Sequence, residues 1–181
     1  MSIPQSLLFR PMMSGDIVTG LSLGDKSFQP LKTFLRKSAL DFHLSDVAKT
    51  YVLVEDISPS KVWGYITIVC SEITLGEGYS LEDCPRANQY KTFAAIKIAR
   101  LAVDRRLRGQ GYGRQMVKWC ISLVKDNIVP IVGCRFLIVD SKSNAISFYE
   151  KIGFTVLDTP ENKQHKKPLM FLDLHRISIE R

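Results

Sequence analysis

The sequence predicts a mixed α/β domain in which helices flank one central sheet, and three observations carry this prediction. First, β-rich runs and amphipathic helical stripes follow one another along the chain. Second, an apolar strand at residues 96–103 enters a glycine-rich turn that opens a helix at once. Third, a strand at residues 135–139 leads into a helix that stops at Gly153, a residue type common at helix ends. The length of 181 residues and the 45% hydrophobic content fit a single domain over residues 1–181.

The first half of the chain predicts a strand, a helix and two further strands. Residues 6–12 form a short β-rich run that ends at a proline or at the Ser-Gly after it. Residues 30–42 predict one helix, because the apolar side chains share a face that the basic residues avoid. This face consists of Leu31, Phe34, Leu35, Ala39 and Phe42. Residues 50–55 and 62–70 are β-rich, and residues 58–61 between them favour a hairpin connection.

The second half predicts a loop, two strand–helix pairs and a last strand. Residues 73–93 combine glycine, proline and mixed polarity, which indicates a long loop with room for one short helix. The nearly continuous apolar run at 96–103 predicts a strand buried on both faces. The helix after it has the apolar stripe Tyr112, Met116, Val117, Cys120, Ile121 and Val124. The remaining predicted elements are a strand at 135–139, a helix at 143–152 and a strand at 169–174.

Composition excludes several classes of protein. The chain has no run of 18 apolar residues, so we expect no membrane span, and its start lacks the features of a signal peptide. We therefore expect a cytoplasmic protein whose four scattered cysteines stay reduced. The histidines His43, His165 and His175 are isolated from one another, so we expect no metal. The net charge of +7 suits an anionic partner, but an ordinary basic surface would give it equally well.

The glycine-rich turn has the composition of a pyrophosphate-binding site. Its glycines Gly109, Gly111 and Gly113 expose backbone N–H groups, and the following helix N-terminus adds more N–H groups and a partial positive charge. Positive side chains come from Arg105, Arg106, Arg108 and Arg114. A P-loop is excluded because the chain has no Gly-Lys-Ser or Gly-Lys-Thr. A dinucleotide fold is excluded because the glycines alternate and lie deep inside the chain.

The pattern Arg108-x-x-Gly111-x-Gly113, preceded by Leu101-Ala102-Val103-Asp104, resembles the acetyl-CoA motif of the GNAT superfamily of N-acetyltransferases. A second block, a strand at 136–140 followed by Asn144-Ala145-x-x-Phe148-Tyr149 and Gly153-Phe154, resembles the next element of that superfamily. Two ordered blocks over residues 96–157 argue against an accidental match. The resemblance implies the GNAT fold: a mixed, mostly antiparallel sheet that splays at the cofactor site, with flanking helices.

The resemblance also implies where acetyl-CoA, the cosubstrate, binds. The strand Leu101-Ala102-Val103 splays from the strand at 136–139, and its backbone bonds the pantetheine arm. The pyrophosphate is surrounded by Arg108, Gly109, Gln110, Gly111, Tyr112, Gly113 and Arg114. Asn144 binds the pantetheine by resemblance, whereas its position at a helix start equally suits a plain N-cap. Turn geometry alone is the alternative for the glycines.

By the same resemblance, Tyr149 is the catalytic acid. Transfer to an amine expels the CoA thiolate, which needs a proton. A phenol of pKa near 10 protonates a thiolate whose acid has a pKa near 8.5 at a cost of about 2 kcal/mol. The alternative for Tyr149 is a core tyrosine on a packed helix. No general base stands out, because Glu55, Glu72 and Asp83 are also placed as ordinary surface carboxylates would be.

The N-terminal half resembles a narrower group, the GNAT toxins of toxin–antitoxin modules. The resemblance lies in Leu31-x-x-Phe34-Leu35-x-x-x-Ala39, residues 50–53, Gly64-Tyr65-x-Thr67 and residues 99–104. Those toxins acetylate the α-amino group of aminoacyl-tRNA, so the resemblance implies that acceptor, a cognate antitoxin and a homodimer. The basic charge agrees, and an α-amine of pKa near 8 needs little activation. The toxins usually carry Cys-Gly where this chain has Leu23-Gly24, and residues 72–93 have no close match.

Two other functions share the cofactor motif. A GNAT enzyme that acetylates a small-molecule or protein amine would carry the same turn. A regulatory module that binds acyl-CoA without turnover would carry it too, although Tyr149 argues against that reading.

Overall fold

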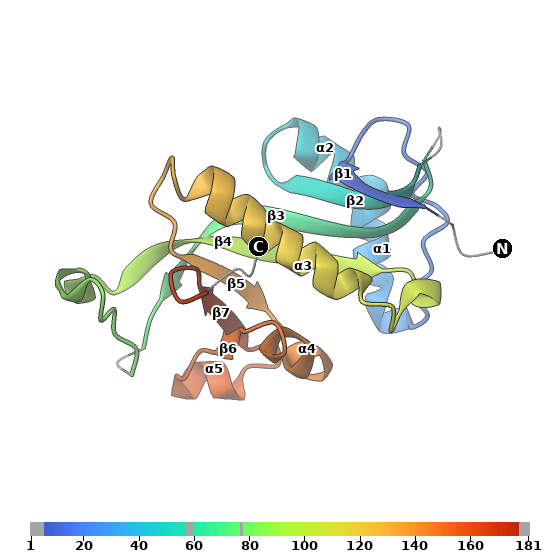
Figure 1. Ribbon diagram of the computed structural model, residues 1–181. Coiled ribbons are helices and arrows are strands. Elements are labelled where there is room, and N and C mark those ends of the chain that lie inside the picture. The colour runs from blue at the N-terminus through green and yellow to red at the C-terminus, as the bar shows by residue number, and fades with distance from the viewer. Residues whose placement is uncertain (1–5, 57–59, 77, 178–181) are drawn as a thin grey trace. The chain divides into compact units, whose positions relative to one another are not determined.

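The computed structural model describes residues 6–56, 60–76 and 78–177, and in them seven strands form one sheet of order β1-β2-β3-β4-β5-β7-β6 (Figure 1). The β4–β5 pair is parallel, and the β1–β2, β2–β3, β5–β7 and β6–β7 pairs are antiparallel. This confirms the predicted mixed, mostly antiparallel sheet. The strands are β1 (Leu7–Pro11), β2 (Lys49–Glu55), β3 (Val62–Thr74), β4 (Thr92–Val103), β5 (Phe136–Asp140), β6 (Thr155–Val156) and β7 (Leu169–Asp173).

Helices flank the sheet, as predicted. The α-helices are α1 (Gln29–Lys37), α2 (Ala39–Leu44), α3 (Tyr112–Leu123), α4 (Ile146–Glu150) and α5 (Pro160–Gln164). Short 3-10 turns are η1 (Lys26–Phe28), η2 (Pro85–Gln89), η3 (Arg105–Leu107) and η5 (Ser143–Ala145), and η4 (Val124–Ile128) is a π-helical turn that continues α3.

The chain divides into two compact units. Unit 1 comprises residues 1–69 and 99–117, and unit 2 comprises residues 70–98 and 118–181. The elements β3, β4 and α3 each continue from one unit into the other.

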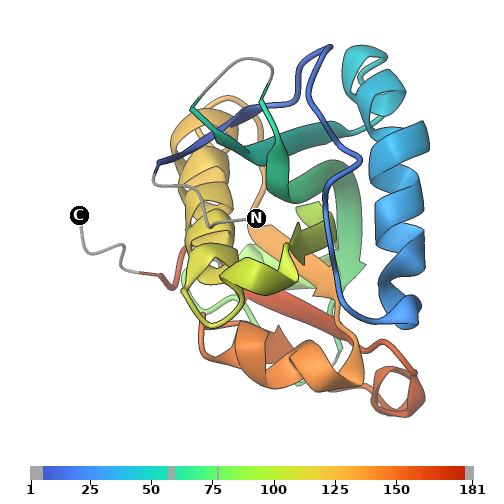
Figure 2. The same cartoon turned by 90° about the vertical axis from the view of Figure 1, so that its right-hand side faces the viewer.

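In unit 1, side chains of β2 and β3 form cores on both faces of the sheet, because successive residues of a strand point to opposite sides. On one face, Tyr65 packs in a cluster with Phe34 of α1, and its hydroxyl donates to the Leu31 carbonyl at 2.8 Å. Figure 2 shows α1 and α2 on one side of these strands. The other face carries a smaller cluster around Trp63, which includes Leu53 and Leu107.

In unit 2, the core forms around Phe136 of β5 and Phe171 of β7, whose rings lie 6.0 Å apart. The segment between β3 and β4 is tied to this core, because Tyr79 donates to Asp173 at 2.7 Å. Arg135 donates to both Asp173 and Asp83. Asp173 of β7 is therefore joined to the same segment a second time, through Arg135 and Asp83. Figure 1 shows α4 beside β6 at the edge of the sheet.

The structure corrects several predicted boundaries. The single helix predicted at 30–42 breaks at Ser38, where φ is −134°, and the break directs the ring of Phe42 against Phe34 at 5.7 Å. The loop predicted at 73–93 is shorter, since β3 runs on to Thr74 and β4 starts at Thr92. The prediction of full burial for 96–103 is wrong in part, because Leu101 and Val103 are half-buried. Residues 58 and 59 of the hairpin connection predicted at 58–61 lie outside the described residues.

Two elements have no counterpart in the predictions. β6 has only two residues, too few for a periodic pattern. α5 is the polar segment Pro-Glu-Asn-Lys-Gln with no apolar face, and it depends on the Thr159 side chain, which accepts from the Asn162 N–H at 3.2 Å.

Candidate functional site

The turn after β4 is organised by Asp104, whose side chain is fully buried. Its carboxylate accepts from the Ser22 N–H at 2.8 Å, from the Arg106 N–H at 3.0 Å and from the Arg106 guanidinium at 2.8 Å. Burial alone would raise the pKa of Asp104, but these donors and the Arg106 charge hold it below its ordinary value. Asp104 therefore stays ionised and joins residues 20–25 to the turn.

The glycines of the turn present bare backbone to open space. Gly109 and Gly111 have φ values of 79° and 84°, in the left-handed region that side chains disfavour. A Cβ on Gly109 would meet no atom within 4 Å. The Gly111 carbonyl accepts from the Gln115 N–H at 3.0 Å, so the N–H groups at 112–114 lack intrahelical acceptors. Open glycine backbone beside a helix N-terminus fits a pyrophosphate, the anionic part of acetyl-CoA.

The four arginines near the turn have different roles. Arg106 holds the turn itself, through Asp104 and through its place 4.2 Å above the Trp63 ring. Arg108 donates to the Leu23 carbonyl at 2.5 Å and lies 5.3 Å from the Phe28 ring centroid. Arg105, Arg108 and Arg114 are exposed. Leu23 stands where the toxins usually carry cysteine, and it contacts this turn through its backbone carbonyl. A leucine supplies that carbonyl as well as a cysteine does.

Tyr149 lies in unit 2, on α4, packed between the rings of Phe148 and Phe154 at 4.9 and 5.4 Å. Its side chain is buried, and no described residue bonds its hydroxyl. Every fully buried polar side-chain atom of the described residues has a partner, so the Tyr149 hydroxyl is in contact with solvent. Burial, with a smaller effect of the nearby Cys120, raises the pKa of this phenol well above 10. The group is therefore a proton donor and not a base at physiological pH.

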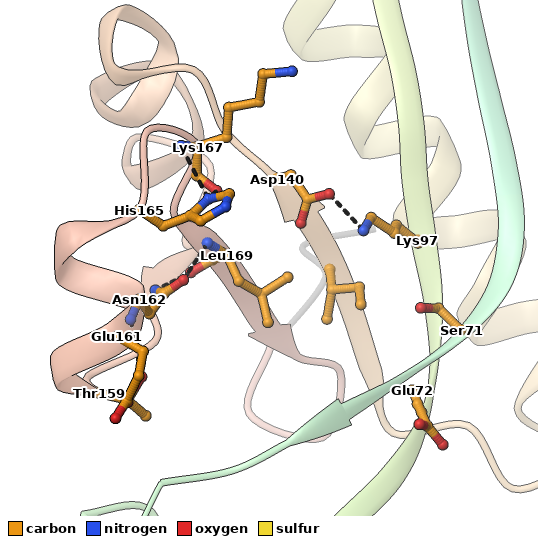
Figure 3. Close-up of a pocket in the computed structure, with 11 residues that line it drawn as sticks. Ser71, Glu72, Lys97, Asp140, Thr159, Glu161, Asn162, His165, Lys167 and Leu169 are labelled. Carbon is orange, nitrogen blue, oxygen red and sulfur yellow. Dashed lines mark hydrogen bonds and ion pairs between the residues drawn. The ribbon is translucent and has the colours of Figure 1, made fainter.

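Asn144 is exposed in η5 and does not cap a helix. Lys142 is the N-cap of η5 and Ala145 that of α4, so the plain-cap alternative is wrong. The three carboxylates considered as general bases lie in different surroundings. Glu55 accepts from the Trp63 indole N–H at 2.9 Å, and Asp83 pairs with Arg135 at 2.7 Å. Glu72 lines a cavity of about 440 Å³ within unit 2 (Figure 3).

The structure distributes the predicted site residues over both units. Unit 1 contains Leu101, Ala102, Val103, Arg108, Gly109, Gln110, Gly111, Tyr112, Gly113 and Arg114, and unit 2 contains Asn144 and Tyr149. Asp104 was not predicted as a site residue, although an aspartate between a strand and an arginine-rich turn is the signal that identifies it. The described residues contain no group of three potential metal ligands. No described helix is long and apolar enough to cross a membrane.

The β4–β5 pair is parallel, and its ladder consists of Ala95↔Phe136, Ile96↔Leu137 and Lys97↔Ile138. Beyond these pairs β5 continues to Asp140 against β7. The ladder ends at Lys97↔Ile138, before the stretch Leu101–Val103 for which the resemblance implies a splay. A mostly antiparallel sheet with this pair, followed by open glycine backbone at a helix N-terminus, is the arrangement expected of an acyltransferase that uses a CoA thioester.

Comparison with known proteins gives the family. Residues 47–156 match the acetyltransferase (GNAT) domain, so this chain belongs to the GNAT family and is an acetyl-CoA-dependent N-acetyltransferase. It is 27% identical to the tRNA-acetylating toxin of Mycobacterium tuberculosis over 165 residues, 89% of this chain and 90% of the relative. A crystal structure of a KacT mutant has a TM-score of 0.81 at 23% identity, covering 94% of this chain and 96% of KacT. AtaT complexed with acetyl-methionyl-tRNAfMet has a TM-score of 0.77 at 22% identity, with the same coverage.

Proposed function

We propose that this enzyme transfers acetyl from acetyl-CoA to the α-amino group of an aminoacyl-tRNA and thereby blocks translation in the cytoplasm. The observation that carries the proposal is the similarity to a tRNA-acetylating toxin over 89% of the chain, well beyond the GNAT match. The fold is also that of AtaT, which was solved with an acetylated aminoacyl-tRNA. The net charge of +7 suits a polyanionic carrier.

For acetyl-CoA, we assign the pyrophosphate to the turn at 108–114. The support is the open backbone at Gly109 and Gly111 and the N–H groups at the start of α3. We assign the pantetheine arm to the backbone of Leu101 and Val103, whose half-buried side chains suit a strand that a substrate covers. The exposed amide of Asn144 completes the binding set.

Tyr149 is the acid that protonates the departing thiolate in this proposal. Its hydroxyl has no partner among the described residues and would be free to donate. The raised pKa makes full proton transfer costlier than the roughly 2 kcal/mol expected for an ordinary phenol, so donation accompanies breaking of the C–S bond. KacT and AtaT were both crystallised as tyrosine-to-phenylalanine mutants, which agrees with a tyrosine of special importance in those toxins.

We also propose a cognate antitoxin, a homodimer and a single domain over residues 1–181. AtaT has been solved bound to the C-terminus of its antitoxin AtaR, which supports the first of these. The dimer follows from the resemblance to the toxins.

The test offers labelled acetyl-CoA to charged tRNA, uncharged tRNA, free polyamines and peptides. We expect label on charged tRNA alone, released as an N-acetylated amino acid after mild alkaline hydrolysis of the ester. Label on polyamine or peptide but not on charged tRNA would overturn this acceptor and leave a GNAT enzyme of another substrate. Binding of acetyl-CoA without transfer to any amine would leave only a binding module.

A further inference from the structure

Unit 2 contains a cavity of about 440 Å³ that none of the assigned acetyl-CoA residues lines (Figure 3). One wall is the sheet, with Glu72 on β3, Lys97 on β4 and Asp140 on β5. The opposite wall is the segment from α5 to β7, with His165. Lys97 belongs to the last β4–β5 pair and lies four residues before Leu101 in the chain. Its ammonium pairs with Asp140 at 2.5 Å across the end of the ladder.

The wall that carries His165 is fixed by Asn162. The Asn162 amide donates to the carbonyls of Leu157 and Leu169 at 2.8 and 3.0 Å, and its oxygen accepts from the Leu169 N–H at 2.7 Å. These bonds tie α5, directly before the histidine, to Leu157 and to Leu169 at the start of β7. The cavity is therefore a preformed feature of unit 2.

His165 has one ring nitrogen engaged and the other available. Its Nδ1 lies 2.8 Å from the Lys167 carbonyl oxygen and 3.2 Å from the Lys167 backbone nitrogen. In the tautomer that is protonated at Nδ1, the shorter contact is a hydrogen bond from Nδ1 to the carbonyl. Donation from Nδ1 leaves the lone pair of the neutral ring on Nε2. Figure 3 shows the ring on the cavity wall that faces Asp140. The backbone of Lys167 thus engages Nδ1, and in the tautomer protonated there Nε2 can accept a proton from the cavity.

The charges around the cavity favour a cation. Glu72, Asp140 and Glu161 contribute carboxylates, and Lys97 neutralises Asp140. Neither Glu72 nor Glu161 has an ion-pair partner within the described part of the chain, and the Lys167 ammonium extends away from the cavity in Figure 3. The chain as a whole has a net charge of +7, whereas this cavity has a local excess of carboxylate. The excess would attract the ammonium group of a substrate whose remaining part is anionic.

We propose that this cavity receives the ammonium group of the acetyl acceptor and that His165 is the catalytic base that deprotonates it. The proposal rests on the proposed function in requiring a primary amine, but it does not require that the amine be carried by tRNA. No general base stands out in the sequence, and His165 would supply one.

The proton balance is simple. Nε2 of His165 takes one proton from the R–NH3⁺ group, and the neutral amine attacks the thioester carbonyl. The N–C bond forms, the C–S bond breaks, and its electron pair leaves on sulfur. The thiolate gains a proton from Tyr149. The attacking nitrogen loses a second proton as the amide forms, and that proton restores the Tyr149 phenol. One proton per turnover therefore leaves through His165 to solvent.

The test compares His165→Gln with His175→Gln, a matched change at the exposed histidine that faces Asp83 instead. Both are assayed on whichever amine the wild type acetylates, with acetyl-CoA affinity measured in parallel. We expect His165→Gln to lower kcat/KM about 100-fold at pH 7 without changing the Kd for acetyl-CoA. We expect the deficit to shrink to within about tenfold near pH 9, where an α-amine is largely neutral without a base. His175→Gln should match the wild type throughout.

A second variant tests the cavity apart from the histidine. Ser71 lies on the β3 wall, half-buried, and Ser71→Trp would fill the space. We expect the KM for the amine to rise at least about tenfold with the Kd for acetyl-CoA unchanged. Wild-type kinetics in either variant at pH 7, or, on an α-amine, an equal deficit of His165→Gln at both pH values, would overturn the proposal. Acetylation of polyamine but not charged tRNA by the wild type would defeat the proposed function alone, and the same variants would then be judged on polyamine. A wild type that acetylates no amine would overturn both.

Discussion

The Asp104 carboxylate accepts a hydrogen bond from the backbone N–H of Ser22 at 2.8 Å, across 82 positions of sequence. Because Asp104 is also bound by Arg106, one buried charge fixes both the turn after β4 and the segment that leads into α1. The turn geometry assigned to the pyrophosphate thus depends on a residue that would not touch it.

Asp104→Asn should destabilise the protein by about 3 kcal/mol at pH 7, because the variant leaves Arg106 without its buried counter-charge. The folded pKa of Asp104 is lowered from 3.8, so its contribution is present above that value and is lost as the pH falls through the folded pKa. Urea unfolding at pH 7 and pH 3 measures this. The difference between wild type and variant should shrink at pH 3.

Asp46→Asn is the control for that experiment. Asp46 is an exposed partner of Lys49 at a φ of 58°, which asparagine tolerates well. Its unfolding midpoint should match the wild type at pH 7. A variant of Asp104 that behaves like this control would show that the buried carboxylate does not organise the turn.

Gly111→Asp should weaken acetyl-CoA binding at least about 100-fold. The side chain would be strained at a φ of 84°, and its charge would repel the pyrophosphate. Isothermal titration with acetyl-CoA measures the loss. Gly78→Asp adds the same charge at a glycine with open surroundings and should bind normally. Equal affinity in the two variants would move the pyrophosphate elsewhere.

Tyr149→Phe should lower kcat about 100-fold and leave the Kd for acetyl-CoA unchanged. Stability should change little, because no described residue bonds the hydroxyl that is removed. Tyr79→Phe has the opposite expectation: it loses a 2.7 Å bond to Asp173, costs about 1 to 2 kcal/mol, and keeps its turnover. Single-turnover acetylation and thermal unfolding separate the two. A Tyr149→Phe enzyme with normal kcat would remove Tyr149 from the acid role.

Arg135→Met should destabilise the protein by about 3 kcal/mol, because it leaves the buried Asp173 without its main counter-charge. Arg86→Met, at an exposed arginine of η2 in the segment that Arg135 contacts through Asp83, should leave the unfolding midpoint unchanged. The measurement is urea unfolding at pH 7. Equal midpoints would mean that Tyr79 and the backbone N–H of His175 suffice to hold Asp173.

Most of the sheet follows from the sequence, because its strands are local runs with strong periodicity. The turn at 108–114 could also be predicted, since glycines and a helix start leave a local signature. The break at Ser38 could not, because the apolar face continues through it and tertiary packing of Phe42 on Phe34 decides the bend.

The candidate site was predictable only where its residues lie in one motif. The contact of Asp104 with Ser22 and the pair of Lys97 with Asp140 join distant segments, and no periodicity encodes such partners. In the sequence His165 is an isolated histidine. Its role could not be predicted, because its partner is in the backbone and its cavity is built from four separate stretches of chain.

The boundaries between the two units fall at residues 69/70, 98/99 and 117/118, which lie inside β3, β4 and α3. A recombination event that exchanged either unit would have to cut regular secondary structure at each of these places. Neither unit can be inherited as a gene fragment with loop boundaries. Point substitution, which leaves β3, β4 and α3 intact, is the kind of change that needs no such cut.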